Sequence, residues 1–145
     1  MTPDEMDHDI ITKFNEVVTP QDHTIHVGDF TLKSTSFAKN IIKQLNGTHT
    51  FLLGSHDRWM KKKGLQIWKK KIEDNYIVAC HYALHTWPRS HFNSWHVFGH
   101  SHGNLQLSGK RHDVGVDNND FYPVSYGSLV EIMDGKSDNF NLVKK

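Results

Sequence analysis

The chain has 145 residues, of which 37% are hydrophobic and 23% charged, and its formal net charge is +1. This composition predicts one soluble globular domain over residues 1–145, and the near-neutral charge excludes a global electrostatic attraction to nucleic acid or membranes. The single cysteine, Cys80, excludes an internal disulfide framework and fits a reducing compartment. No apolar run approaches the roughly 20 residues of a membrane span, and the first residues do not resemble a signal peptide, so we expect a cytoplasmic protein.

Hydrophobic periodicity predicts alternating helices and strands in the first half of the chain. Thr2 and Glu5 are spaced as a capping box at the start of the first helix. The predicted elements are a helix over 3–18, a turn over 19–22, a strand over 24–27, a helix over 36–45 and a strand over 48–53. The stretch 58–71 mixes large apolar residues with six lysines, and its pattern predicts no definite structure.

The second half of the chain is richer in short strands. We predict strands over 76–80 and 95–98, separated by a polar and aromatic loop over 84–93. Further predicted elements are short strands over 105–108 and 114–116, a helix over 126–133 and an edge strand over 139–143. Helices and strands that alternate in this way indicate an α/β layered architecture.

Polar residues follow the carboxyl ends of four predicted strands. They are Asp29, Ser55-His56-Asp57, His81 and the His-x-His pair formed by His100 and His102. Ligands of α/β sheets bind at that edge, and a set of carboxylates and imidazoles suits Zn, Mn or Fe. A metal held there can bind a phosphate oxygen and lower the pKa of a coordinated water.

These motifs, in this order and approximate spacing, resemble those of the calcineurin-like metallophosphoesterases, especially the small phage and bacterial members. The motifs are Gly28-Asp29, Gly54-Ser55-His56-Asp57, Cys80-His81-Tyr82 and Gly99-His100-Ser101-His102-Gly103. The resemblance implies a fold of two mixed β-sheets flanked by helices. It also implies a hydrolase in the cytoplasm of a bacterium or a phage-infected cell.

The resemblance also assigns roles by position. Asp29 matches the aspartate that bridges two metals, His81 and His100 match ligands of the second metal, and His102 matches a ligand of the first. His56 matches the histidine that contacts the phosphate and assists the leaving group, and Asp57 matches the acid that orients it. Ser55 stands where the family has an asparagine ligand, and a hydroxyl is the poorer neutral donor.

The family's opening strand, which ends in Asp-x-His and supplies two ligands of the first metal, has no counterpart here. We therefore predict one tightly held divalent metal at the second position, with Mn, Zn and Fe as candidates and Ni also compatible. The first position should be weakly filled or empty. Loss of the strand should also leave an unpaired edge, which favours a rearranged sheet or a homo-oligomer.

Three functions remain open at this point. The first is phosphodiester hydrolysis by a metal-bound hydroxide, with a nucleotide or nucleic acid as a possible phosphate-ester substrate. The second is a degenerate member that binds a metal or phosphate ligand without turnover. The third is nucleic-acid binding through Lys61–Lys63 and Lys69–Lys71 with Trp59 and Trp68, although lysine runs are usually solvated faces.

Other polar residues have weaker assignments. Arg58 and Arg89 are candidate substrate contacts because they follow site motifs, and a solvent-facing loop position is an equal alternative for Arg89. Trp87 and the rest of the loop are expected to border the same pocket. His26 and His96, which lie on or beside strands, are predicted to serve in packing. The remaining histidines that we regard as solvated or loop residues are His23, His49, His85, His91 and His112.

Overall fold

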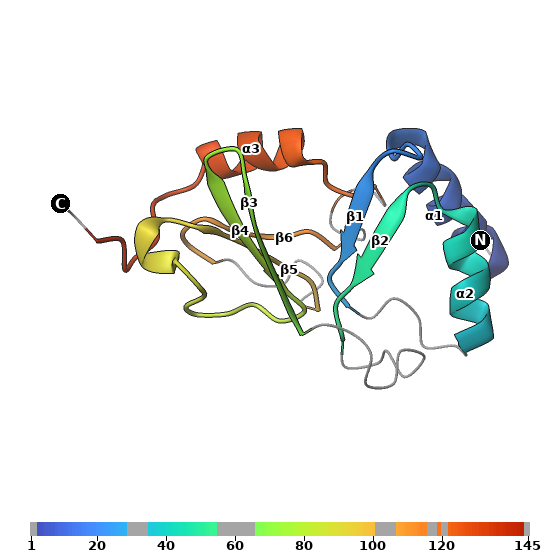
Figure 1. The fold of residues 1–145 in the computed structure, drawn as a ribbon, viewed down its shortest axis with the longest axis horizontal. Helices are drawn as coiled ribbons and strands as arrows, with labels where there is room; N and C mark the ends of the chain where they lie inside the picture. The colour runs from blue at the N-terminus through green and yellow to red at the C-terminus, as the bar shows by residue number, and fades with distance from the viewer. Residues whose placement is uncertain are drawn as a thin grey trace.

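The structure, a computed structural model, describes residues 3–28, 35–54, 66–100, 107–115, 119 and 122–143 (Figure 1). This part of the chain is a mixed α/β arrangement with three α-helices and two sheets. The helices are α1 (Pro3–Val17), α2 (Thr35–Gln44) and α3 (Tyr126–Asp134), and Ser90–Phe92 form a short 3-10 helix. The strands are β1 (His23–His26), β2 (Thr48–Phe51), β3 (Ile67–Ile72), β4 (Asn75–Cys80), β5 (Trp95–Phe98) and β6 (Arg111–Asp113).

The strands form one parallel pair and one mixed sheet. β1 and β2 pair in parallel, with His23 opposite Thr48 and His26 opposite Phe51. The second sheet has the order β3-β4-β5-β6; β3 and β4 form an antiparallel hairpin, and the other neighbours are parallel. Two mixed sheets were predicted. The four-stranded sheet is mixed, as predicted, whereas the described strands β1 and β2 pair only in parallel. Helix α2 connects β1 to β2, and such a crossover joins parallel neighbours.

The hydrophobic core lies between the two sheets and α3. Its buried members are Leu52, Ile77, Ala79, Trp95, Val97, Leu129 and Met133. Ile25 and Val27, from β1 and the residue that follows it, pack against the same cluster. α1 and α2 lie on the outer side of the β1–β2 pair, away from the four-stranded sheet (Figure 1). The core therefore holds the ends of β1 and β2 close to the ends of the strands in the larger sheet.

The other face of the four-stranded sheet is covered by the loop that the sequence predicts over 84–93. Trp87 and His96 are buried there with their rings 5.2 Å apart. The indole Nε1–H of Trp87 donates to Ser94 Oγ at 2.9 Å, and Ser94 Oγ donates to Pro88 O at 2.8 Å. These bonds satisfy the buried polar groups of the loop, which therefore serves as a second packing layer.

Most predicted elements are confirmed within one or two residues. The helices over 3–18, 36–45 and 126–133 correspond to α1, α2 and α3. The predicted strand over 95–98 has the same bounds as β5, and those over 24–27, 48–53 and 76–80 correspond to β1, β2 and β4. Amphipathic helices and apolar strands are the patterns that periodicity detects best.

The strand predictions on either side of the core were less accurate. The stretch without a predicted structure contains β3, where Trp68 and Ile72 pack on the core while lysines take the exposed positions. The strand predicted over 114–116 lies three residues earlier, as β6. Arg111 can be buried there because its guanidinium group donates to the carbonyl oxygens of Ser108 and Leu84 at 2.8 Å. Of the strand predicted over 105–108, residues 107 and 108 are irregular, and 105 and 106 lie outside the described residues.

No edge strand forms over 139–143, where the chain turns instead. The side chain of Asn139 holds this segment against the loop: its amide donates to the carbonyl oxygens of Ser90 and Ser94 at 3.0 and 2.9 Å. Its Oδ1 accepts from the backbone N–H of Lys110 at 2.7 Å. Hydrogen bonds from one buried side chain thus replace the backbone ladder that the pattern suggested.

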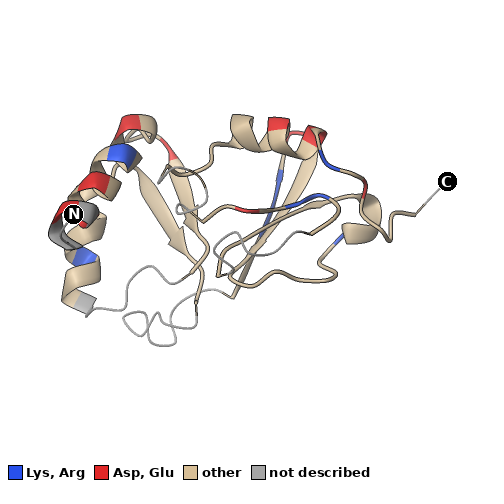
Figure 2. Ribbon diagram, turned by 180° about the vertical axis from the view of Figure 1, so that it is seen from behind, with Lys and Arg blue, Asp and Glu red and all other residues tan. Residues whose placement is uncertain are grey.

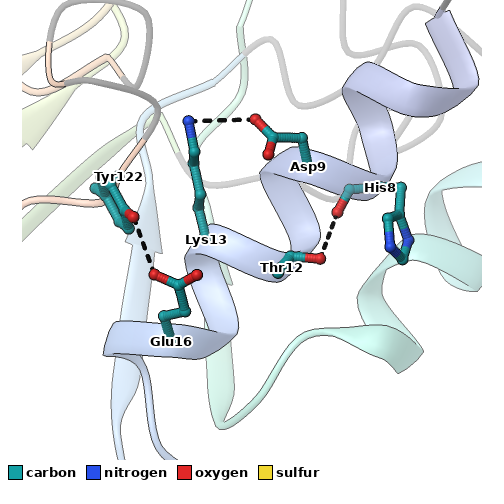
Figure 3. A network of polar contacts seen from close by, with 6 residues as sticks. All are labelled: His8, Asp9, Thr12, Lys13, Glu16 and Tyr122. Carbon is teal, nitrogen blue, oxygen red and sulfur yellow. Dashed lines mark hydrogen bonds and ion pairs between the residues drawn. The ribbon is translucent and has the colours of Figure 1, made fainter.

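A polar network ties α1 to the segment before α3 (Figure 3). Tyr122 donates its hydroxyl to Glu16 at 2.9 Å, which raises the pKa of Tyr122, and Lys13 pairs with Asp9 at 3.2 Å. Acidic and basic residues thus lie near each other on this helix (Figure 2). Exposed pairs of this kind contribute little stability, so the network mainly fixes where the two segments meet. Among the described helices, none has the length and apolar character that crossing a bilayer requires.

Candidate metal centre

The carboxyl ends of β1, β2 and β4 meet at two glycines. Gly28 has φ +105°, a conformation that suits glycine, and a Cβ placed on it would lie 2.5 Å from His81 Nδ1. The same Cβ would lie 2.9 Å from both Cα and N of Gly54. Any larger residue at position 28 would push these three strand ends apart.

The end of β5 joins the same edge. The backbone N–H of Gly99 donates to His81 O at 3.1 Å, and a Cβ on Gly99 would lie 2.9 Å from Val27 Cγ2. The carboxyl ends of four strands, drawn from both sheets, therefore meet at one place. This is the position at which α/β proteins bind their ligands.

His81 is buried at this edge with its tautomer determined. Its side chain is 1% exposed, and its Nδ1 lies 2.9 Å from the carbonyl oxygen of Val27. A carbonyl can only accept, so Nδ1 carries the ring proton and Nε2 presents a lone pair. Metal-binding histidines are held in this way, with one ring nitrogen donating to a backbone carbonyl.

His100 meets that lone pair from the end of β5. Its Nδ1 lies 3.0 Å from His81 Nε2, and its backbone has φ +65°. A side chain at positive φ costs on the order of 1–3 kcal/mol and is found preferentially at functional sites. Two imidazole nitrogens that bind one metal at about 2.1 Å and at right angles lie about 3.0 Å apart. The observed separation is that of a hydrogen bond between the two rings, and it also equals the spacing of neighbouring ligands of an octahedral metal.

The described part of the chain brings together two of the predicted ligands, His81 and His100. No third His, Cys, Asp or Glu in the described ranges joins them. The other predicted site residues lie outside those ranges: Asp29, Ser55, His56, Asp57, Arg58 and His102. In the sequence, Asp29 directly follows Gly28 and Ser55 directly follows Gly54. The roles of these six residues stay predictions.

Arg89 is not brought to the histidine pair. Its guanidinium carbon lies 4.8 Å from the ring centroid of Tyr76, near the start of β4, whereas His81 follows the end of that strand. Five residues of strand separate Tyr76 from His81, a distance of about 16 Å. Trp87 is likewise buried against His96 rather than at the edge. Closeness in sequence to His81 was therefore a poor guide to closeness in space.

The histidines predicted to serve in packing do so. His96 is fully buried; its Nδ1 donates to Val78 O at 3.0 Å, its Nε2 accepts from the N–H of Leu84 at 3.0 Å, and burial lowers its pKa. The His26 ring stacks on Phe51 with centroids 4.5 Å apart. Burial, followed by the neighbouring charges of His49 and His23, lowers the pKa of His26 to about 3.

His49 corrects one prediction. It was placed among the solvated or loop histidines, but it lies in β2 with its ring 5.9 Å from that of Phe14 and its Nδ1 3.0 Å from His26 Nε2. Burial is the main cause that lowers its pKa. The polar residues on both sides of it in the sequence obscured its position on the face that α1 covers.

Tyr82 and the carbonyl group of Val27 had no predicted role. The ring of Tyr82 lies 4.7 Å from that of His81 and 4.7 Å from that of His100. The position of Tyr82 directly after His81 was the one sequence feature that could have indicated this contact. Hydrophobic periodicity does not reveal contacts between aromatic rings at a strand end. A backbone carbonyl has no sequence signature, so the bond that determines the His81 tautomer required the tertiary structure.

Comparisons with known proteins support the fold and leave the function open. No family model matches the chain. It is 26% identical over 143 residues to the uncharacterized protein MJ1445 of Methanocaldococcus jannaschii, covering 90% of this chain and 77% of that protein. The crystal structure of AQ665, a protein of unknown function from Aquifex aeolicus, matches with a TM-score of 0.65 and 21% identity, over 87% of this chain and 84% of that one. The mixed α/β architecture is therefore shared with a solved protein.

Proposed function

We propose that this protein is a metal-dependent phosphoesterase of the calcineurin-like type that hydrolyses phosphodiesters. The observation that carries the proposal is the His81–His100 pair, which lies where four strand ends meet. His81 Nδ1 is bonded to a backbone carbonyl, so that Nε2 faces His100, and His100 is exposed to solvent. The ordered motifs at the ends of the same strands support the family.

The metal would be held by His81 and His100, together with Asp29 as the bridging ligand and Ser55 as a weaker fourth. A divalent metal bound there supplies Lewis acidity and lowers the pKa of a coordinated water. Mn, Fe, Zn and Ni all accept imidazole and carboxylate ligands. We propose one tightly held metal for each chain, at the position that His81 and His100 share.

The residues of the chain then have separate tasks. His81, with Nδ1 bonded to the Val27 carbonyl, would present Nε2 to the metal. His56 would donate a proton to the leaving oxygen of the substrate, and Asp57 would orient its ring. The substrate class we propose is a phosphodiester of the nucleotide or nucleic-acid type.

Hydrolysis of a chromogenic phosphodiester, with added Mn²⁺, Zn²⁺, Fe²⁺ or Ni²⁺ and with or without a chelator, tests the proposal. We expect activity that the chelator abolishes. His56→Ala should lower turnover about 100-fold while the metal content measured by elemental analysis stays unchanged. A protein that hydrolyses no diester with any of these metals would contradict the proposal, and a His56→Ala variant without metal would instead place His56 among the ligands.

A degenerate member that binds a metal or phosphate ligand without turnover is the second candidate, because the described residues bring together two of the predicted ligands and no third. Retained metal without hydrolysis would establish that function. The nucleic-acid hypothesis is weakened, because Trp68 is partly buried against the core and offers less of its ring for stacking on bases. Lys69–Lys71 lie on β3 at the edge of the sheet, where lysines commonly prevent edge-to-edge pairing.

A further inference from the structure

Three aromatic rings pack against one another at the candidate metal centre, at nearly equal distances from each other. The ring centroids of His81, His100 and Tyr82 lie 4.7, 4.7 and 4.8 Å apart, and each pair is inclined steeply, at 61° to 77°. Edge-to-face packing at this distance is favourable and directional. Each ring therefore blocks rotation of the other two.

The two histidines are held in different ways. His81 is buried and has a backbone partner in Val27, whereas His100 is exposed at positive φ. Within the described residues, the His100 ring forms a hydrogen bond with His81. It also packs against the rings of His81 and Tyr82. When both nitrogens bind a metal, they no longer bind each other. The ring packing is then what orients His100.

We infer that Tyr82 is a positioning residue that holds the imidazoles of His81 and His100 in the orientation that a metal requires. Tyr82 is 45% exposed and contributes little to the core, so its contact with both rings is its main structural role. The contacts are made by the aromatic ring, which means that phenylalanine can replace tyrosine and an aliphatic side chain cannot. This inference rests on the proposed metal centre and deepens it.

Titration of the full chain with Co²⁺, followed by visible absorption, tests the inference independently of turnover. Tyr82→Leu should bind Co²⁺ with a dissociation constant about 10-fold to 100-fold higher, the range typical of partners that orient metal ligands. Tyr82→Phe should bind within about threefold of the unchanged protein. Its ligand-field bands should also keep the wavelengths of the unchanged protein, whereas those of Tyr82→Leu should shift.

Phe92→Leu is the matched control. Phe92 is 65% exposed and packs 4.1 Å from the ring of His91, a histidine with no proposed role. Loss of the Phe92 ring should leave the affinity of the protein for Co²⁺ unchanged. If Tyr82→Leu is unfolded by circular dichroism, Tyr82→Met gives the same test with an unbranched side chain.

The outcomes separate the inference from the proposed function. An unchanged protein that binds no Co²⁺ would overturn the metal centre and the inference with it. Tight binding by both the unchanged protein and Tyr82→Leu would overturn the inference and leave the centre standing. Equal losses in Tyr82→Phe and Tyr82→Leu would assign the effect to the hydroxyl and so overturn the argument from ring packing.

Discussion

Two histidine pairs in this molecule have the same nitrogen separation and opposite surroundings. His26 Nε2 lies 3.0 Å from His49 Nδ1, and His81 Nε2 lies 3.0 Å from His100 Nδ1. The first pair joins the last residue of β1 to the second residue of β2, on the face that α1 covers, and the second lies just beyond the ends of β4 and β5. Distance alone therefore does not distinguish a metal site from packing.

The surroundings make the distinction. The His26–His49 pair is enclosed by aromatic rings, with Phe14 on α1 and Phe51 on β2, so its nitrogens face each other inside a packed layer. His100, in contrast, is exposed, and His81 has its other nitrogen bound to Val27. A metal site needs solvent access and histidines whose ring nitrogens are oriented by a second hydrogen bond, and the described residues at the strand ends meet both needs, through His100 and His81 respectively.

The largest expected difference between the pairs is in metal affinity. His100→Ala removes one of two described ligands and should weaken Mn²⁺ binding by more than about 100-fold, since even the loss of a supporting residue costs 10-fold to 100-fold. His49→Phe, which keeps an aromatic ring beside Phe14, should leave the affinity unchanged. Isothermal titration measures both. A loss of metal in His49→Phe would show that the enclosed pair binds it.

The close approach of strands at the second pair should make it intolerant of added volume. Gly28→Ala places a methyl group against His81 and Gly54 at positive φ, and we expect it to lower the free energy of unfolding by about 3 kcal/mol. Gly127→Ala is the control: a Cβ there meets nothing within 4 Å inside α3. It should stabilise the protein by about 0.5–1 kcal/mol. Urea denaturation compares the two, and equal stability would mean that the strand ends are loosely packed.

The enclosed pair should instead be sensitive to acid. The pKa of His26 is lowered from 6.5 to about 3, so between these values the unfolded chain binds more protons and stability falls as the pH falls. The loss contributed by this residue at pH 5 is about 2 kcal/mol. In His26→Phe, the free energy of unfolding should therefore decrease less between pH 6.5 and pH 3 than in the unchanged protein. The measurement is made with a chelator present, so that bound metal does not contribute.

His91→Phe, which replaces an exposed histidine, provides the control for this measurement and should keep the slope of the unchanged protein. If His26→Phe keeps that slope as well, the acid sensitivity belongs to another group and the enclosed pair is more hydrated than its packing indicates.

The amino-acid sequence by itself determined the elements whose patterns are strong. The apolar spacing of α1 and α2 and the run Trp95–Phe98 are local properties, so periodicity located them closely. It also placed His81 and His100 at strand ends, and their facing nitrogens agree with that placement. β3 was not predicted because the lysines between Trp68 and Ile72, the two residues that pack on the core, interrupt the hydrophobic pattern of the strand.

The tertiary structure decided what depends on partners far away in the chain. Both His49 and His100 have small or polar neighbours in the sequence, and only the packing of α1 against β2 distinguishes the half-buried His49 from the exposed His100. The position of Arg89 over Tyr76 follows from how its loop folds back across the sheet. The tautomer of His81 depends on the carbonyl of Val27, 54 residues earlier. A backbone carbonyl is present in every residue, so the sequence cannot indicate which one will bond to His81. The folded structure identifies it.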